Sequence, residues 1–148
     1  MKKKKRIPRI VRIPVTSTLR DEFAMQLHTS LRALEYSPCV DIFDNLAGIF
    51  NVVQLALEHD AKRSHEARLI TGGAAALNQA MTKVIAGQPP AAHEIAPIRV
   101  GVNTIDALLG RLDVSVLHGA MQRLAVLRSM GQQKKIDTAE QPQKQAVA

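Results

Sequence analysis

The segment 58–66 holds the densest group of side chains that could bind a metal or act in acid–base catalysis, among them Glu58, His59 and His65. Zinc proteases place two histidines four residues apart, because that spacing brings both onto one face of a helix. His59 and His65 are six residues apart and diverge on a continuous helix, so we expect no shared metal site. Glu58 and Lys62 are one helical turn apart, which favours a solvent-exposed, ion-paired helix face.

A second candidate for chemistry is the thiol of Cys39, the only cysteine in the chain. It lies where a second helix is expected to begin, and a helix N-terminus favours the nucleophilic thiolate. Asp41 and Asp44 follow closely in the sequence and oppose an anion, and no local motif supplies a histidine partner. We therefore expect no reactive cysteine. A single cysteine also forms no internal disulfide, which is compatible with a cytoplasmic protein.

Gly72 and Gly73 are the closest match to a phosphate-binding loop. Such loops read GxxxxGK[ST], or GxGxxG after a strand, so that backbone N–H groups can approach an anion. Neither pattern occurs, and the glycine pair lies inside a helical pattern. We interpret the pair as a close contact between helices or a kink.

The strongest charge feature is a basic arm at the start of the chain, residues 1–15. Residues 13–148 hold thirteen Lys or Arg against thirteen Asp or Glu, so the arm accounts for the whole formal charge of +7. Clustered cations neutralise phosphates and release counterions, which gives salt-sensitive binding to nucleic acid. The predicted phosphate-binding residues are Lys2, Lys3, Lys4, Lys5, Arg6, Arg9 and Arg12.

Low aromatic content and the absence of a long apolar run narrow the choice of partners. With 3% aromatic residues the chain has too few rings to stack single-stranded bases, so duplex DNA or structured RNA is the expected nucleic acid.

The longest run without a charged residue has fourteen residues, whereas a membrane-spanning helix needs about 20. We therefore expect no membrane span. The alternatives for the arm are a solvated tail and an anchor to an anionic membrane, although no lipid-facing amphipathic helix supports the anchor.

Apolar spacing and helix breakers place the elements that carry these residues. The first helix is expected from Thr18, a capping residue, to Glu35. The second begins near Asp41 and has a wide apolar face, which predicts a position at the centre of a bundle. Residues 58–63 form either a turn or an exposed stretch of one continuous helix. The third helix contains the glycine pair and ends before 87–90.

The last part of the chain is harder to divide. Prolines predict a long connection to Asn103, with a short strand at 98–100, and then one amphipathic helix as far as Met130. A helix-turn-helix with a second helix starting at Val114 is the less favoured alternative, because 109–113 lacks a convincing turn. In that alternative, the polar side chains that would contact the edges of bases are His118, Gln122 and Arg123.

Together these features predict an all-α protein, a small bundle of about four principal helices over residues 16–130, with an extended basic arm and a disordered tail over residues 131–148. We expect a non-enzymatic binding or regulatory protein in the cytoplasm that contacts nucleic-acid phosphates through the arm and needs no cofactor or metal. It could form a homodimer through its last helix. The alternative is a helical adaptor or scaffold that binds another protein, with the arm incidental.

Overall fold

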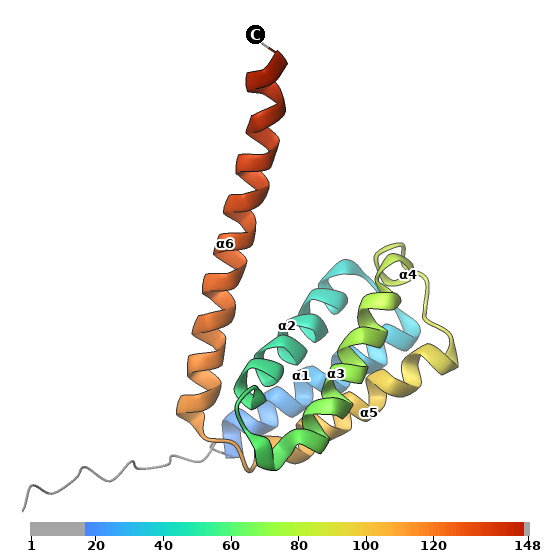
Figure 1. Cartoon of the computed structure of the whole chain (residues 1–148). Coiled ribbons are helices and arrows are strands. Elements are labelled where there is room, and N and C mark those ends of the chain that lie inside the picture. The colour runs from blue at the N-terminus through green and yellow to red at the C-terminus, as the bar shows by residue number, and fades with distance from the viewer. Residues whose placement is uncertain (1–16, 147–148) are drawn as a thin grey trace, which may run out of the picture.

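A computed structural model describes residues 17–146, with side chains described over residues 18–131. The elements are α1 (Ser17–Tyr36), α2 (Val40–Leu57), the short 3-10 helix η1 (Ala61–Arg63), α3 (Ser64–Gln79), α4 (Met81–Ile85), α5 (Ala92–Leu109) and α6 (Val114–Ala146). These residues contain no strand, so the predicted all-α fold is confirmed (Figure 1). The basic arm predicted over residues 1–15 lies outside the described residues.

The first two helices begin and end close to where the sequence predicts. Between them Pro38 cannot donate a backbone N–H to a continuing helix. The next residue, Cys39, is extended, with φ −154° and ψ 173°, and α2 starts immediately after it. The break therefore has a local cause that a single sequence reveals.

The central helix of the bundle is α2, as its wide apolar face predicts. It packs against α1, α3, α4 and α6. Its buried residues are Phe43, Leu46, Ile49, Phe50, Val52, Val53 and Leu57. By length and composition α2 is also the one described helix that could cross a membrane, but the core helix of a bundle has the same properties.

Two glycines let α3 and α5 approach closely over the ring of Phe50. A Cβ atom on Gly101 of α5 would lie 2.6 Å from Cε1 of Phe50 and 3.4 Å from Cα of Gly73. A Cβ atom on Gly73 of α3 would lie 3.0 Å both from that ring and from the carbonyl oxygen of Pro97. This contact confirms close packing for Gly73, whereas Gly72 beside it faces open space.

The helix α5 corrects the prediction of a long connection with a strand at 98–100. Five apolar residues of α5 are buried at alternating spacings of three and four, namely Ile95, Ile98, Val102, Ile105 and Leu109. Pro97 stands inside this helix. Its ring removes one backbone hydrogen bond, at a cost of about 3 kcal/mol, and burying each large apolar side chain gains about 1.5–3 kcal/mol. The free energy gained by burying the whole apolar face of α5 is therefore larger than the cost of Pro97 in the helix.

The start of α5 is fixed by Glu94. Its Oε1 accepts a hydrogen bond from the backbone N–H of Ala91 at 3.2 Å and one from Nζ of Lys83 on α4 at 2.6 Å. The hydrogen bond from Lys83, followed by the one from Ala91, lowers the pKa of Glu94 below its ordinary value of 4.5. The carboxylate thus satisfies a free N–H of the first turn and ties α5 to α4.

The single last helix predicted up to Met130 is also wrong, because the chain breaks at 110–113. The backbone N–H groups of Arg111 and Leu112 both donate to the carbonyl of Leu108, which closes α5. The carboxylate of Asp113 then accepts a hydrogen bond from the N–H of Ser115 at 2.7 Å and starts α6. The boundary at Val114 is the one given by the less favoured helix-turn-helix alternative.

At its other end α6 extends through Ala146. The disordered tail over residues 131–148 stays a prediction. Gln, Lys and Ala are the commonest residues of this stretch, and all three have high helix propensity. Figure 1 shows the second half of α6 leading away from the other helices.

Candidate functional site

A cleft of about 560 Å³ opens at the end of the bundle, between the end of α2, η1, the turn at 110–113 and the first turns of α6. We call it the α2–α6 cleft. Its charged and polar lining residues come from the residues between α2 and η1, from η1, from the turn at 110–113 and from α6: His59, Asp60, Arg63, Arg111, Asp113, Ser115 and Arg123. Its floor is apolar and includes Leu112, Val116 and Ala120.

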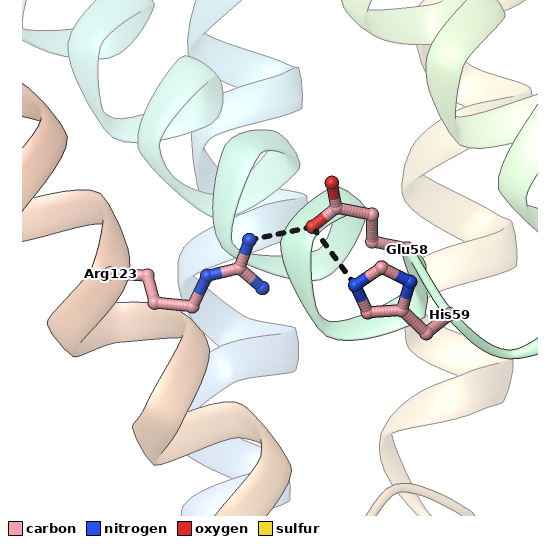
Figure 2. A network of polar contacts seen from close by, with 3 residues as sticks. All are labelled: Glu58, His59 and Arg123. Carbon is pink, nitrogen blue, oxygen red and sulfur yellow. Dashed lines mark hydrogen bonds and ion pairs between the residues drawn. The ribbon is translucent and has the colours of Figure 1, made fainter.

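The segment 58–66, which the sequence marks as the densest group of chemical side chains, supplies one wall of this cleft. Nη2 of Arg123 on α6 lies 2.7 Å from Oε2 of Glu58, and Nε2 of His59 lies 4.0 Å from the same oxygen (Figure 2). The expected partner of Glu58 was Lys62, and that prediction is wrong. Because α2 ends at Leu57, Lys62 is not one helical turn further along the same helix.

The ion pair between Glu58 and Arg123 links α6 to the end of α2. The pKa of the Glu58 carboxyl lies below its ordinary value of 4.5, first because Arg123 donates a hydrogen bond to it and then because the guanidinium charge attracts it. A carboxyl with a lowered pKa stabilises the fold above its ordinary pKa, and this contribution is lost as the pH falls through the lowered value. Both side chains are about half exposed, so solvent screens the attraction.

The remaining groups of the segment have local structural roles. The side chain of Asp60 accepts a hydrogen bond from the N–H of Lys62 at 3.2 Å and caps η1. Its other oxygen lies 3.3 Å from Nε of Arg63. His65 is exposed at the start of α3. Within the described part of the chain, no three His, Cys, Asp or Glu side chains are grouped as metal ligands would be.

Two arginines next to the cleft have no acidic partner among the described residues. The guanidinium of Arg20 on α1 lies against Gly110, with Nη1 3.2 Å from the place of a Cβ atom there. Arg111 follows Gly110 and lines the cleft. The beginning of α1 therefore lies beside the α5–α6 turn. The predicted phosphate-binding residues directly precede α1 in the sequence but lie outside the described residues.

The polar residues of α6 that would contact bases in the helix-turn-helix alternative already interact with other groups of the protein. Nε2 of Gln122 lies 3.2 Å from Nε2 of His118, and Arg123 holds Glu58. Cys39 is exposed at the N-cap of α2, and within the described residues its thiol makes no hydrogen bond. The structure thus does not bring Cys39 and the segment 58–66 into one site.

The contact of Arg123 with Glu58, and the place of Arg111 beside the cleft, are the features that sequence reasoning misses. No periodicity links residues 65 positions apart, and the only signal available is an arginine on an otherwise apolar stretch of α6.

The fold and the cleft together define only a broad class, an all-α bundle with an ion-paired cleft at one end. No protein-family model, no curated protein and no solved structure matches this chain.

Proposed function

We propose that this protein is a non-enzymatic binding or regulatory protein that contacts nucleic-acid phosphates through its basic arm. The observation that carries the proposal is the placement of charge. Lys2 to Lys5, Arg6, Arg9 and Arg12 supply the whole net charge of +7, and the rest of the chain is balanced. A compact run of cations next to a neutral body binds an extended polyanion without requiring a cleft.

The surface next to the arm supports the same function. Arg20 and Arg111 lie at the end of the bundle where α1 begins, and neither forms an ion pair with a described acidic residue. They would add phosphate contacts close to those of the arm. Two exposed cations near the start of α1 would help the bundle dock against the backbone of a nucleic acid.

The placement of the aromatic residues favours a duplex or structured RNA over a single strand. Phe43 and Phe50 are buried in the core, and Phe23 packs against it. Tyr36 is the one exposed ring among the described residues, and the guanidinium of Arg32 lies 5.9 Å from its centre. One ring does not make a platform on which successive bases stack.

Binding to a labelled DNA duplex and a labelled RNA hairpin, measured by fluorescence anisotropy across a salt series, tests the proposal. We expect steeply salt-dependent binding that disappears when all seven arm cations are replaced by glutamine. Replacing only Lys3, Lys4 and Lys5 should reduce the slope of log K against log salt by up to about 2.7, at about 0.9 per phosphate contact on duplex DNA.

A matched control removes the same number of charges from the body of the protein. Arg32, Lys62 and Arg68 are exposed, and their replacement by glutamine should leave the slope unchanged if the arm is the binding element. Equal losses in the two triple variants would contradict the assignment to the arm. If the wild-type protein binds neither nucleic acid at low salt, the proposal is wrong and the adaptor function becomes the better one.

The sequence also predicts a capacity to form a homodimer, which would bring two arms to one nucleic acid and raise their effective concentration. The mass of the protein in solution, measured with and without the duplex, tests this. A mass of two chains supports the prediction, and a mass of one chain under both conditions contradicts it.

A further inference from the structure

The helix α6 carries a stripe of residues that borders the α2–α6 cleft and continues past it along an exposed side of the helix. Val116, Gly119, Arg123, Val126 and Met130 follow one another at spacings of three, four, three and four, which places them along one side of the helix. We call this the α6 stripe. Val116 is 45% exposed, Val126 58% and Met130 55%. Alternating spacings of three and four are the pattern by which one helix packs along another.

A groove runs along this stripe. The α2–α6 cleft and a neighbouring, mainly apolar cavity of about 540 Å³ share Gly119 and Arg123 as lining residues. The second cavity extends the groove past Val126 and Leu127, both more than half exposed. A Cβ atom on Gly119 would have no described atom within 4 Å, so a partner backbone can approach there. The groove is therefore partly charged at the α2–α6 cleft, mainly apolar beyond Gly119, and open to solvent.

The charges around the groove indicate what can occupy it. Among the described residues of α6, Arg123 is the charged residue that lines the groove, whereas Arg128 lies against Gly48 of α2 in a different cavity. Arg63 and Arg111 stand on the facing wall. The carboxylates near the groove already have partners within the protein. Glu58 forms an ion pair with Arg123, Asp60 forms one with Arg63, and Asp113 caps α6. The occupant should thus bring its own negative charge.

A second copy of α6 fits this requirement poorly at the α6 stripe, so the homodimer predicted through the last helix would have to use another face of that helix. Two parallel copies of the stripe would bring Arg123 against Arg123 at its centre, and in either orientation two acid-free segments would repel. A phosphate backbone gains nothing from the exposed valine, leucine and methionine side chains. A lipid surface contacts apolar side chains that protrude from a protein more readily than side chains that line a groove.

We propose that the groove receives an amphipathic α-helix of a partner protein that is apolar along one face and acidic beside it. Its apolar face would pack on Val116, Val126 and Met130 with helix-in-groove geometry. Its carboxylates would lie near Arg111 and the exposed half of Arg123. This site is separate from the basic arm, so the proposal does not depend on nucleic-acid binding.

A designed peptide of about 20 residues, with leucines at alternating spacings of three and four and glutamates elsewhere, serves as the probe. The matched peptide carries lysine in place of each glutamate. We measure binding of both by fluorescence anisotropy to the full-length protein whose seven arm cations are glutamine, which removes nonspecific attraction to the arm. We expect the acidic peptide to bind at least about tenfold more tightly than the basic peptide, which is about 1.4 kcal/mol.

Two valine substitutions locate the binding surface. Val126→Glu adds a negative charge inside the groove and should weaken binding of the acidic peptide about tenfold or more. Val100→Glu changes an exposed valine of α5 that lies outside the groove, and it should leave the affinity unchanged. Both positions are exposed on helices, so neither change threatens folding.

Three outcomes would overturn the proposal. The first is that the acidic and the basic peptide bind equally tightly, or that neither peptide binds. The second is an equal effect of the two valine substitutions. The third is binding of the same protein to vesicles that contain phosphatidylserine, abolished by Val126→Glu, without binding of the acidic peptide; that result would assign the stripe to an anionic lipid surface. A loss of duplex binding in the arm variant leaves the proposal untouched, so the two functions are tested separately.

Discussion

At the scale of single residues, the fold depends on the absence of two side chains. Gly73 and Gly101 let α3 and α5 meet over the ring of Phe50, which is fully buried. Glycine inside a helix costs about 1 kcal/mol relative to alanine, yet here it avoids a larger steric cost. Gly72, one residue from Gly73, has no such role, because a side chain there would enter open space.

We predict that Gly101→Ala lowers the free energy of unfolding by about 1–2 kcal/mol. Overpacking of about 1–3 kcal/mol against Phe50 exceeds the gain in helix propensity. Urea denaturation followed by circular dichroism measures the change. Gly72→Ala is the control and should raise the free energy of unfolding by up to about 1 kcal/mol. If both substitutions stabilise the protein, α3 and α5 do not cross as closely as described.

At the scale of elements, α5 is the helix that local rules fail to predict. Proline at its sixth position and two further prolines before it indicate a connection. The buried face from Ile95 to Leu109 instead requires a helix, since only helical spacing brings these side chains to one side. The hydrogen bond that Pro97 removes is the one its N–H would have donated to His93.

Replacing Pro97 by alanine should therefore stabilise the protein, by about 1–3 kcal/mol in the free energy of unfolding, because it restores a hydrogen bond and removes a clash with the preceding turn. Thermal and urea unfolding would measure it.

Pro89→Ala provides the comparison, since Pro89 is exposed and lies before α5. It should destabilise slightly, by about 0.4–1 kcal/mol, through greater freedom of the unfolded chain. A loss of stability in Pro97→Ala as well would argue that residues 92–109 are not one helix.

At the scale of the whole molecule, α6 differs from the other long helices in how little of it is buried. Leu117 and Ala120 are buried, and Leu124 packs partly against the core. Beyond these residues the helix leaves the bundle (Figure 1). Cations gather on this helix and, in the sequence, on the arm, while the acids lie mostly on the bundle. In the sequence, this division separates a bundle that holds most of the acids from two cationic segments, which are the segments we propose to bind partners.

Removing residues 131–148 should consequently leave the free energy of unfolding unchanged within about 0.5 kcal/mol, because the described contacts of α6 with the core, those of Leu117, Ala120 and Leu124, all precede residue 131. The helical signal in circular dichroism should fall with the residues removed. Leu117→Ala, in contrast, opens a cavity under α6 and should cost about 2–5 kcal/mol. A large destabilisation by the truncation would show that the second half of α6 packs on another surface.

The sequence by itself determines the all-α class, the first two helices and the imbalance of charge. These features are local or additive: apolar spacing defines a helix face, Pro38 ends α1, and charges sum along the chain. The sequence also predicts that Gly73 is a packing residue, although it does not identify Phe50 and Gly101 as its neighbours.

Only the tertiary structure decides which distant residues meet. It brings Arg123 to Glu58 instead of Lys62, joins the segment 58–66 to the α5–α6 turn in one cleft, and extends a helix through Pro97. Each of these outcomes depends on burial shared among several helices, and a local rule assigns no energy to a contact with a residue far away in the chain. For that reason the bundle could be predicted from the sequence, whereas the cleft and the α6 stripe could not.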